Sequence, residues 1–389
     1  MYKYPLQTDN FSLWDRIKAS LFVLNKQNRL TCGPKTKELE DKWEKITESK
    51  AVATSSGSTA NHLLVETFIQ TNNFKPKDVV VFAPSTTWSS SITPWIMRGC
   101  KVVLVDINLQ DFSFDYNKLQ LELENEEHIN KIKVIWPTAL IGFIPNINKL
   151  KELKALNENT FLFGDFCETT IGDYEEKHCV SHFDMSTTSF FWAHEICGIE
   201  LGMLFINDDK YLNTAHCIRS HGLTRAIPSD EERDSLNKKY SYIDKEFTFV
   251  MHGTNYRPTD LNSFFCLMDT DRYFEHRHNR NKIWSYFLKN LPDKYIKLNQ
   301  DITPFCLPLI TKYQSNSLSS TKQLLNKNGW ETRPVICFIP LNPAFRGNST
   351  IEEIHRNFPN SSYLHQNGFY VGINKDLTYA DIDKLLELC

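Results

Sequence analysis

The sequence predicts an α/β protein with a mostly parallel sheet, followed by a smaller α+β unit. The prediction depends on two observations. Short β-branched runs with few charges alternate with segments long enough for crossover helices through about residue 210, as in sheets buried on both faces. The chain also has 389 residues, more than one hydrophobic core usually supports. We therefore expect a large domain at residues 1–255, and a connecting helix with a small domain at residues 256–389.

The elements of the large domain can be assigned in chain order. Residues 34–47 place apolar side chains at spacings of four and three, which is the stripe of an amphipathic helix with Pro34 near its start. Residues 50–70 indicate a strand, a turn of small residues and an apolar helix. Residues 186–205 indicate two short buried strands joined by a turn. Further buried strands are predicted at residues 78–84, 101–107, 132–140 and 160–166, and a crossover helix at residues 89–99.

The C-terminal third predicts a different arrangement. Residues 253–284 lead into a long helix that connects the two domains. Three apolar runs beyond it, at residues 305–313, 329–340 and 368–374, predict the smaller α+β unit.

Composition excludes several classes of function. The 44 basic and 47 acidic residues give a formal charge of −3, so nothing electrostatic favours a nucleic acid or an anionic membrane as partner. No run reaches the ~20 apolar residues that a membrane helix needs, and the first residues lack the apolar region of a signal peptide. We expect a soluble, cytoplasmic protein. Its ten cysteines are scattered without a C-x-x-C pair, which predicts reduced thiols and no metal or iron–sulfur site.

Candidate binding residues follow the predicted strands, where open parallel sheets bind their ligands. Ser56, Gly57 and Ser58 lie between a strand and a helix, so they either hold a phosphate or form an ordinary helix cap. Trp88, among small hydroxyl residues, either stacks on a flat ring or lies in the core, the commoner position for tryptophan. Asp165 ends an apolar strand, and a buried carboxylate there requires a cation or several donors. A protonated heterocyclic nitrogen meets this requirement, and so does a structural arginine.

One ionisable residue, His194, lies in the middle of an otherwise apolar run. Ser189 precedes it by five residues and Glu200 follows it by six. In a turn at the mouth of a sheet, His194 is a candidate base near neutral pH, whereas a lone histidine is more often an ordinary core or surface residue. Asn255, before the long helix, and Arg333, before a proline, are either anion ligands or ordinary polar connections.

Taken in order, these motifs resemble the DegT/DnrJ/EryC1/StrS sugar aminotransferase family of fold-type I pyridoxal-phosphate (PLP) proteins. The resemblance covers nearly the whole chain. In that family, a lysine five residues after the serine of an S-F-x-x-x-K segment binds PLP covalently, and here that position is His194. Histidine there is characteristic of the nucleotide-sugar 3-dehydratases, and the resemblance is greatest to members that act on GDP-4-keto-6-deoxymannose. The motifs are TCGPKTKELEDKW, SSGSTAN, PSTTW, VDI, DFCET, SFFWAH, RSHGLTR, NYRPTD and ETRP.

The resemblance implies where the cofactor binds. Gly57, Ser58 and Ser189 would hold its phosphate, and Asn255 would reach it from the second subunit of a homodimer. Trp88 would stack on the pyridine ring. Without a lysine at the site, PLP or its amine form, pyridoxamine phosphate (PMP), would bind non-covalently.

The resemblance also implies a lyase mechanism. Asp165 would pair with the protonated ring nitrogen and keep the cofactor an electron sink. His194 would act as base at C4′ of the cofactor and assist loss of the C3 hydroxyl from a nucleotide-linked 4-keto-6-deoxyhexose, and L-glutamate would regenerate PMP. The RSHGLTR region has no cysteine, which argues against an iron–sulfur reductase as partner. Further candidates for substrate contacts are His221, Arg225 and Arg333.

Several positions depart from the subgroup's usual pattern. Glu195 replaces a histidine, Leu201 a glycine, Gly164 an acid and Phe143 an asparagine, and the glycine–asparagine pair expected after ETRP is missing. We expect Leu201 to crowd the cofactor's surroundings, and Glu195 either to tune the imidazole of His194 or to face outward. The departures keep two alternatives open: an aminotransferase that works without the lysine, and a non-catalytic member of the family. A plain nucleotide-binding α/β protein is disfavoured because the chain lacks a G-x-G-x-x-G motif.

Overall fold

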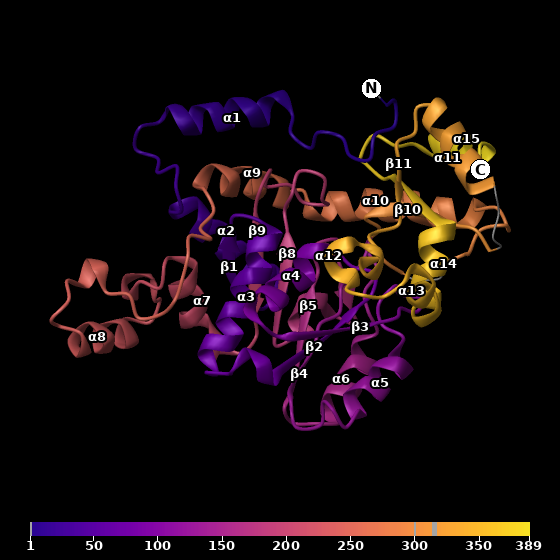
Figure 1. Ribbon diagram of the computed structural model, residues 1–389. Helices are drawn as coiled ribbons and strands as arrows, with labels where there is room; N and C mark the ends of the chain where they lie inside the picture. The colour runs from indigo at the N-terminus through magenta and orange to yellow at the C-terminus, as the bar shows by residue number, and fades with distance from the viewer. Residues whose placement is uncertain (1, 299–300, 313–316) are drawn as a thin grey trace.

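The computed structural model describes residues 2–298, 301–312 and 317–389, and it confirms the α/β fold class. Within these residues the chain forms a large sheet of seven strands, covered by helices on both faces, and a second sheet of three strands (Figure 1). The C-terminal elements, orange and yellow in Figure 1, lie beside the large sheet. No helix in the described residues is long and apolar enough to cross a membrane.

The strands of the large sheet overlap the predicted runs, although β4 ends at Ile135, well before the end of the run at residues 132–140. The strands are β1 Lys50–Thr54, β2 Val79–Pro84, β3 Lys101–Val105, β4 Ile132–Ile135, β5 Thr160–Asp165, β8 Met185–Ser189 and β9 Gly202–Ile206. Their order in the sheet is β1-β9-β8-β5-β4-β2-β3. β9 runs antiparallel to both of its neighbours, β1 and β8, and the other neighbouring pairs are parallel, so the sheet is mostly parallel as predicted. A short hairpin of β6 (Asp173–Tyr174) and β7 (Lys177–His178) lies outside it.

Successive strand residues point into two separate cores. In β2, Val80 and Phe82 belong to one core, whereas Val79 and Val81 belong to the other. Burial on both faces explains why these strands have apolar residues at consecutive positions. One core is covered by α2 (Pro34–Thr47), α5 (Tyr116–Glu124) and α6 (Ile147–Ala155), and the other by α3 (Gly57–Thr71), α4 (Ser89–Arg98) and α7 (Leu212–Arg219).

Local sequence sets the helix starts. Pro34 opens α2, where its missing N–H would be unpaired in any case, and the predicted stripe residues Leu39 and Trp43 are fully buried. Ser56 caps α3: its hydroxyl accepts the Thr59 amide at 3.2 Å, and the Thr59 hydroxyl accepts the Ser56 amide at 2.9 Å. This capping box places the start of α3 at the carboxyl end of β1.

The C-terminal unit is α+β, as predicted, and each of its three apolar runs contains one strand. The strands are β10 (Cys306–Ile310), β11 (Thr332–Pro334) and β12 (Gly368–Gly372), in the antiparallel order β10-β12-β11. Tyr313, which ends the first predicted run, lies outside the described residues. The predicted connecting helix is divided into α9 (Asp260–Thr270) and α10 (Tyr273–Asn290). The remaining helices are α11 Ser317–Lys327, α12 Pro343–Arg346, α13 Ile351–Asn357, α14 Pro359–Asn367 and α15 Tyr379–Glu387.

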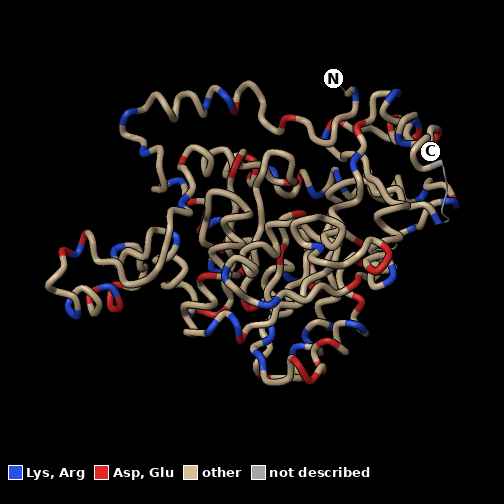
Figure 2. The backbone as a smooth tube through the Cα atoms, viewed as in Figure 1, with Lys and Arg blue, Asp and Glu red and all other residues tan. Residues whose placement is uncertain are grey.

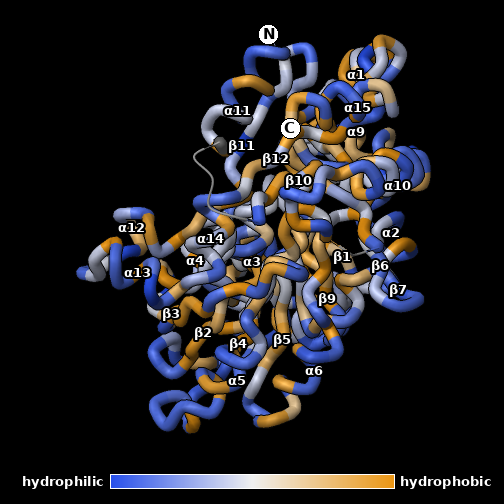
Figure 3. The backbone as a smooth tube through the Cα atoms, turned by 90° about the vertical axis from the view of Figure 1, so that its right-hand side faces the viewer, coloured by the Kyte–Doolittle hydropathy of each residue, from blue (hydrophilic) through white to orange (hydrophobic). Residues whose placement is uncertain are grey.

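The N-terminal arm, residues 2–11, packs on this C-terminal unit. Tyr4 forms a parallel bridge with Trp330, and the two rings stack with centroids 4.1 Å apart. The Leu6 amide donates to Glu331 Oε2 at 3.1 Å. The N- and C-termini consequently lie on the same side of the molecule, as Figure 3 shows. The predicted domain boundary near residue 255 stays a prediction.

Two exposed apolar surfaces lie outside the cores. A projecting segment, residues 228–252, contains α8 (Asp230–Lys239) and extends away from the body at the left of Figure 1. It exposes Phe247 and Phe249. Acidic and basic residues are interspersed along the described chain, as Figure 2 shows. The second surface, which we call the α1 face, lies on α1 (Leu13–Leu24) and consists of Leu13, Trp14, Leu21 and Leu24.

Candidate active site

A cavity of about 910 Å³ lies at the carboxyl ends of the parallel strands, where ligands of open α/β sheets bind. Its other wall comes from the C-terminal unit, with Phe305, Phe338 and Tyr370, and from Leu6 of the N-terminal arm. The structure brings together most of the residues selected from the sequence. Those that line the cavity are Gly57, Ser58, Trp88, Asp165, Ser189, His194 and Arg333.

The turn of residues 56–58, which we call the phosphate turn, is packed tightly against the end of β8. A Cβ atom on Gly57 would lie 2.7 Å from Ser189 Cβ and 2.9 Å from Cys167 Sγ, so only glycine fits. Ser58, in the first turn of α3, and the Ser189 hydroxyl line the cavity beside it. Amides at the start of a helix together with two hydroxyls form an anion-binding arrangement.

Asp165, at the end of β5, is a buried carboxylate surrounded by neutral donors. Its Oδ2 accepts hydrogen bonds from Asn61 Nδ2 at 3.0 Å and from the Ser91 hydroxyl, and its Oδ1 accepts the Cys167 amide at 3.0 Å. No arginine or lysine of the described chain forms an ion pair with it. The structural-arginine alternative is therefore wrong, and the cavity side of Asp165 can still receive a cation.

Trp88 precedes α4 and is 60% exposed. It lines the cavity instead of packing in the core, which excludes the commoner position for a tryptophan. An exposed aromatic ring at the mouth of a cavity provides a flat surface for a planar ligand.

His194 lies in the loop between β8 and β9, residues 190–201, which we call the His194 loop. Its Nδ1 is 3.3 Å from the Ser189 carbonyl oxygen, an arrangement that keeps the proton on Nδ1 and leaves Nε2 as an acceptor. The rings of Phe191 and Phe305 meet the imidazole edge-on, at 5.7 Å and 5.3 Å between centroids. Burial lowers the pKa of His194 to about 4, so the imidazole is neutral near pH 7.

Glu195 points away from the cavity. Its Oε2 accepts the Ile171 amide at 2.9 Å, its Oε1 has no hydrogen-bond partner among the described residues, and burial raises its pKa to about 7. The expectation that Glu195 faces outward is therefore wrong, and no hydrogen bond joins it to His194. Leu201 is also fully buried in the core and is not a cavity-lining residue, so it does not crowd this space.

Sequence reasoning missed one cavity residue with unusual chemistry, Glu168. Its Oε2 accepts the Ile141 amide at 3.2 Å, and burial raises its pKa to about 8, with Asp165 and Glu195 contributing. It is therefore a protonated acid at neutral pH. Its position three residues after Asp165, in the same strand-end loop, was the available signal.

The other selected residues are not among those that line the cavity. Asn255 forms an antiparallel bridge with Ser220, and its Oδ1 accepts Arg257 Nε at 3.0 Å. The carbonyl of the next residue, Tyr256, accepts the Ser55 amide at 2.9 Å, so this segment passes close to the phosphate turn. His221 Nε2 lies 3.4 Å from Arg257 Nη2, and Arg225 pairs with Glu246 at 2.6 Å.

With this sheet and these strand-end residues, the protein is of the fold-type I, aminotransferase-like class. It belongs to the DegT/DnrJ/EryC1/StrS aminotransferase family, and the family match extends over residues 14–388.

Relatives and solved structures cover nearly the whole chain. It is 29% identical to the GDP-4-keto-6-deoxy-D-mannose 3-dehydratase of Escherichia coli O55:H7 over an alignment 406 positions long, with 100% of each chain covered. It is 25% identical to the GDP-perosamine synthase of Caulobacter vibrioides, with 86% of this chain and 84% of the relative covered. A solved structure of GDP-4-keto-6-deoxymannose-3-dehydratase with a trapped PLP-glutamate geminal diamine has a TM-score of 0.84 and 26% identity, covering 99% of this chain and 100% of that one.

Proposed function

We propose that this protein is a hydro-lyase, a PLP/PMP-dependent nucleotide-sugar 3-dehydratase. Its substrate would be an NDP-4-keto-6-deoxyhexose of the GDP-4-keto-6-deoxymannose type, which loses its C3 hydroxyl. The observation that carries the proposal is His194 in the cavity, five residues after Ser189, at the position of the family's lysine. No lysine occurs among the described residues that line the cavity. The 3-dehydratase that aligns with the whole chain supports the substrate class.

The residues present fit the cofactor. The first amides of α3 and the hydroxyls of Ser58 and Ser189 would hold its phosphate. Asp165, which has only neutral partners in the described chain, would hold the protonated ring nitrogen, and Trp88 would cover one ring face. When bound, PMP supplies the amine that reacts with the C4 ketone and the ring that accepts an electron pair.

His194 would move the proton. Its Nε2 would accept a proton from C4′ of the cofactor and deliver it to the C3 oxygen, which would leave as water. Because burial disfavours the imidazolium, delivery of that proton would be favoured. The products would be a 3-deoxy-4-keto sugar and ammonia, with L-glutamate as the amino donor for the cofactor. The PLP-glutamate adduct in the related 3-dehydratase structure supports glutamate as co-substrate.

A homodimer would complete the site. Asn255, His221 and Arg225 do not line the cavity of their own chain, and in this proposal they contact the cavity of a second copy. The α1 face and the exposed Phe247 and Phe249 of the projecting segment provide apolar area for such an interface. Asn255 would then contact the cofactor phosphate, and His221 and Arg225 the substrate.

Arg333 is a candidate for binding the nucleotide. It lines the cavity, and its Nη2 pairs with Glu331 at 3.1 Å. In this proposal the other N–H groups of its guanidinium would contact a nucleotide phosphate.

The cysteines bear on the compartment. We place the protein in the cytoplasm, because its ten cysteines are all unpaired and free thiols persist in a reducing compartment.

The test is incubation of the purified protein with PMP, L-glutamate and a panel of NDP-4-keto-6-deoxyhexoses, followed by mass spectrometry. Loss of the C3 oxygen without gain of nitrogen supports the proposal. Gain of an amino group instead identifies an aminotransferase. If the protein binds no PMP and converts none of the sugars, it is a non-catalytic member of the family.

A further inference from the structure

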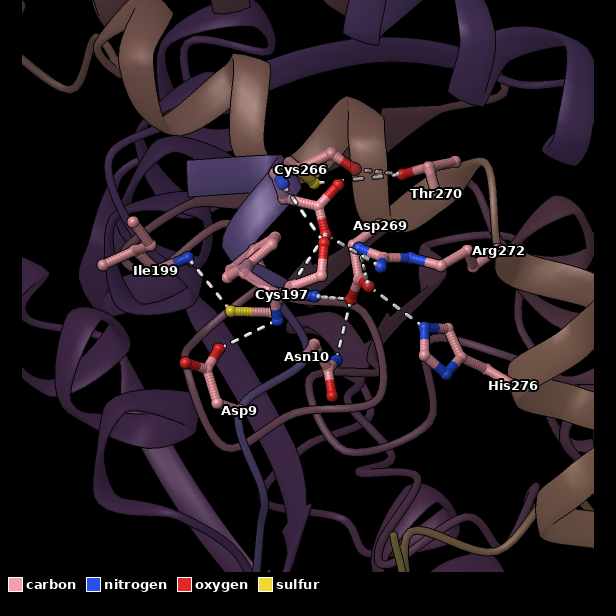
Figure 4. A network of polar contacts seen from close by, with 12 residues as sticks. Asp9, Asn10, Cys197, Ile199, Cys266, Asp269, Thr270, Arg272 and His276 are labelled. Atoms are coloured by element: carbon pink, nitrogen blue, oxygen red, sulfur yellow. Dashed lines mark hydrogen bonds and ion pairs between the residues drawn. The ribbon is translucent and has the colours of Figure 1, made fainter. Parts of the chain in front are cut away.

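The His194 loop is anchored by a carboxylate that lies outside the cavity. Asp269, in α9, has no exposed surface, and its two oxygens have different partners (Figure 4). Oδ2 accepts the backbone amide of Cys197 at 2.8 Å and Asn10 Nδ2 at 2.9 Å. Oδ1 faces His276 Nε2 at 3.0 Å and Arg272 Nη2 at 3.1 Å. One carboxylate therefore joins the His194 loop, the N-terminal arm and α10.

The backbone of the loop is strained close to this anchor, and the Gly198 amide also donates to the Phe190 carbonyl at 2.7 Å. Ile199 has a φ of 67°, the left-handed conformation that β-branched residues disfavour. The neighbouring Gly198 packs so closely that a Cβ would lie 3.0 Å from Leu201 Cβ and 3.1 Å from Cys266 Cβ. The Cys197 amide bonded to Asp269 lies between this strained turn and His194. Loss of that bond would allow the loop to relax, and His194 would move with it.

The N-terminal arm connects the same anchor to the opposite wall of the cavity. Asn10 is bonded to Asp269, and the ring of the next residue, Phe11, lies 6.2 Å from that of Trp192 in the His194 loop. At the other end of the arm, Leu6 lines the cavity and its amide donates to Glu331. The second oxygen of Glu331 pairs with Arg333. The arm thus contacts both the loop that carries His194 and the strand that carries Arg333.

We propose that Asp269 is a positioning residue. Its carboxylate holds the His194 loop, and the N-terminal arm fixes the position of this loop relative to Arg333 on the opposite side of the cavity. The proposal rests on the proposed function, because the effect on catalysis passes through His194. Proton transfer is sensitive to displacements of about 1 Å, whereas binding of the nucleotide and of the cofactor phosphate depends on other residues. Loss of the hydrogen bonds that Asp269 accepts should therefore lower kcat more than it changes KM.

The test uses Asp269→Asn, which preserves size but turns one oxygen into an NH₂ group. In either orientation that group faces donors, from Cys197 and Asn10 or from His276 and Arg272. We expect about tenfold faster hydrogen–deuterium exchange at the Cys197 amide in the cofactor-free protein. We also expect kcat to fall about tenfold while KM for the sugar stays within about twofold. The matched control is Asp271→Asn, on an exposed residue two positions further that pairs with Lys42.

A second variant covers the case in which Asp269→Asn fails to fold. Asn10→Ala removes one of the two donors to Oδ2, so we expect smaller changes in the same direction. In the Asp269→Asn background it should add nothing, because both act on one anchor. Folded variants with wild-type exchange at residues 190–201, or with faster exchange and unchanged kcat, overturn the proposal. The exchange measurement needs no substrate, so it decides on the anchor even if the dehydratase assay fails.

Discussion

His194 and Glu195 are adjacent in the sequence but face opposite sides of their loop. His194 lines the cavity, whereas Glu195 Oε2 accepts the Ile171 amide in the interior. The imidazole is therefore available to a substrate, and the carboxylate is a buried acid whose pKa is raised to about 7.

His194→Asn should abolish dehydration while leaving PMP bound. Asparagine cannot accept the proton, so we expect kcat to fall by about 10³-fold or more. In the wild-type protein the base must be unprotonated, and its pKa is lowered to about 4. The rate should therefore be independent of this group above about pH 5 and decline only as pH falls towards 4. Product formation between pH 4 and 9, with PMP affinity measured by fluorescence titration, checks both statements; a rate loss centred near pH 6.5 would contradict the second.

His194→Lys should convert non-covalent PLP binding into a covalent bond. The new amine would share the cavity with Asp165 and Ser189, the residues expected to hold the ring nitrogen and the phosphate. Borohydride treatment of the PLP complex should fix the cofactor to this position, as detected by peptide mass spectrometry. His194→Gln is the control and should retain no cofactor after denaturation. Fixation at a different residue, or none with PLP bound, would show that His194 does not occupy the lysine position.

Glu168→Gln should reduce the dependence of stability on pH. Burial raises the pKa of Glu168 from 4.5 to about 8, so the native state keeps a proton that the unfolded chain releases. The wild-type protein therefore loses stability from this group as pH rises from about 4.5 to about 8. Glutamine removes this linkage and should stabilise the cofactor-free protein at pH 8 by on the order of 2 kcal/mol, with little change at pH 4.5.

Thermal unfolding at the two pH values measures this effect. Glu126→Gln, on an exposed residue, is the control and should leave both melting temperatures unchanged. A Glu168→Gln protein that follows the wild-type pH profile would mean that Glu168 is ionised in the native state.

Mixed dimers test whether Asn255 acts on the partner's cavity. His194→Asn and Asn255→Ala proteins should each be inactive as homodimers. If the site is shared, a mixed dimer contains one intact site, formed by His194 of one chain and Asn255 of the other. Co-expression at equal levels should then restore about a quarter of the wild-type activity. If Asn255 acts within its own chain, no site in the mixed dimer is intact and no activity returns.

The strand-end residues could be predicted because the rule behind them is local. Gly57, Trp88, Asp165 and Ser189 each follow a short apolar run, and parallel strands bring such positions to one edge of the sheet. His194 was found in the same way, together with the resemblance to the family. The strand-end part of the cavity was therefore predictable from the sequence.

What could not be predicted depends on side-chain direction in irregular backbone. Nothing in the sequence around Glu195 shows that its carboxylate points inward, because the His194 loop has no regular period. The bond between Asn10 and Asp269 joins residues 259 positions apart, and local patterns contain no such information. The contact of Leu6 with the cavity and the absence of Asn255 from its lining are tertiary facts of the same kind.

The antiparallel position of β9 also has a consequence for the kinetics of folding. β1 pairs with β9, and Thr54 lies opposite Gly202, far away along the chain. Such long-range pairings close slowly, because the loop-closure entropy is lost before the contacts form. The phosphate turn follows β1 and the His194 loop precedes β9, so these two parts of the cavity meet only when β9 enters the sheet. In a refolding experiment, capture of PMP should therefore lag behind helix formation and report the time at which β9 pairs with β1.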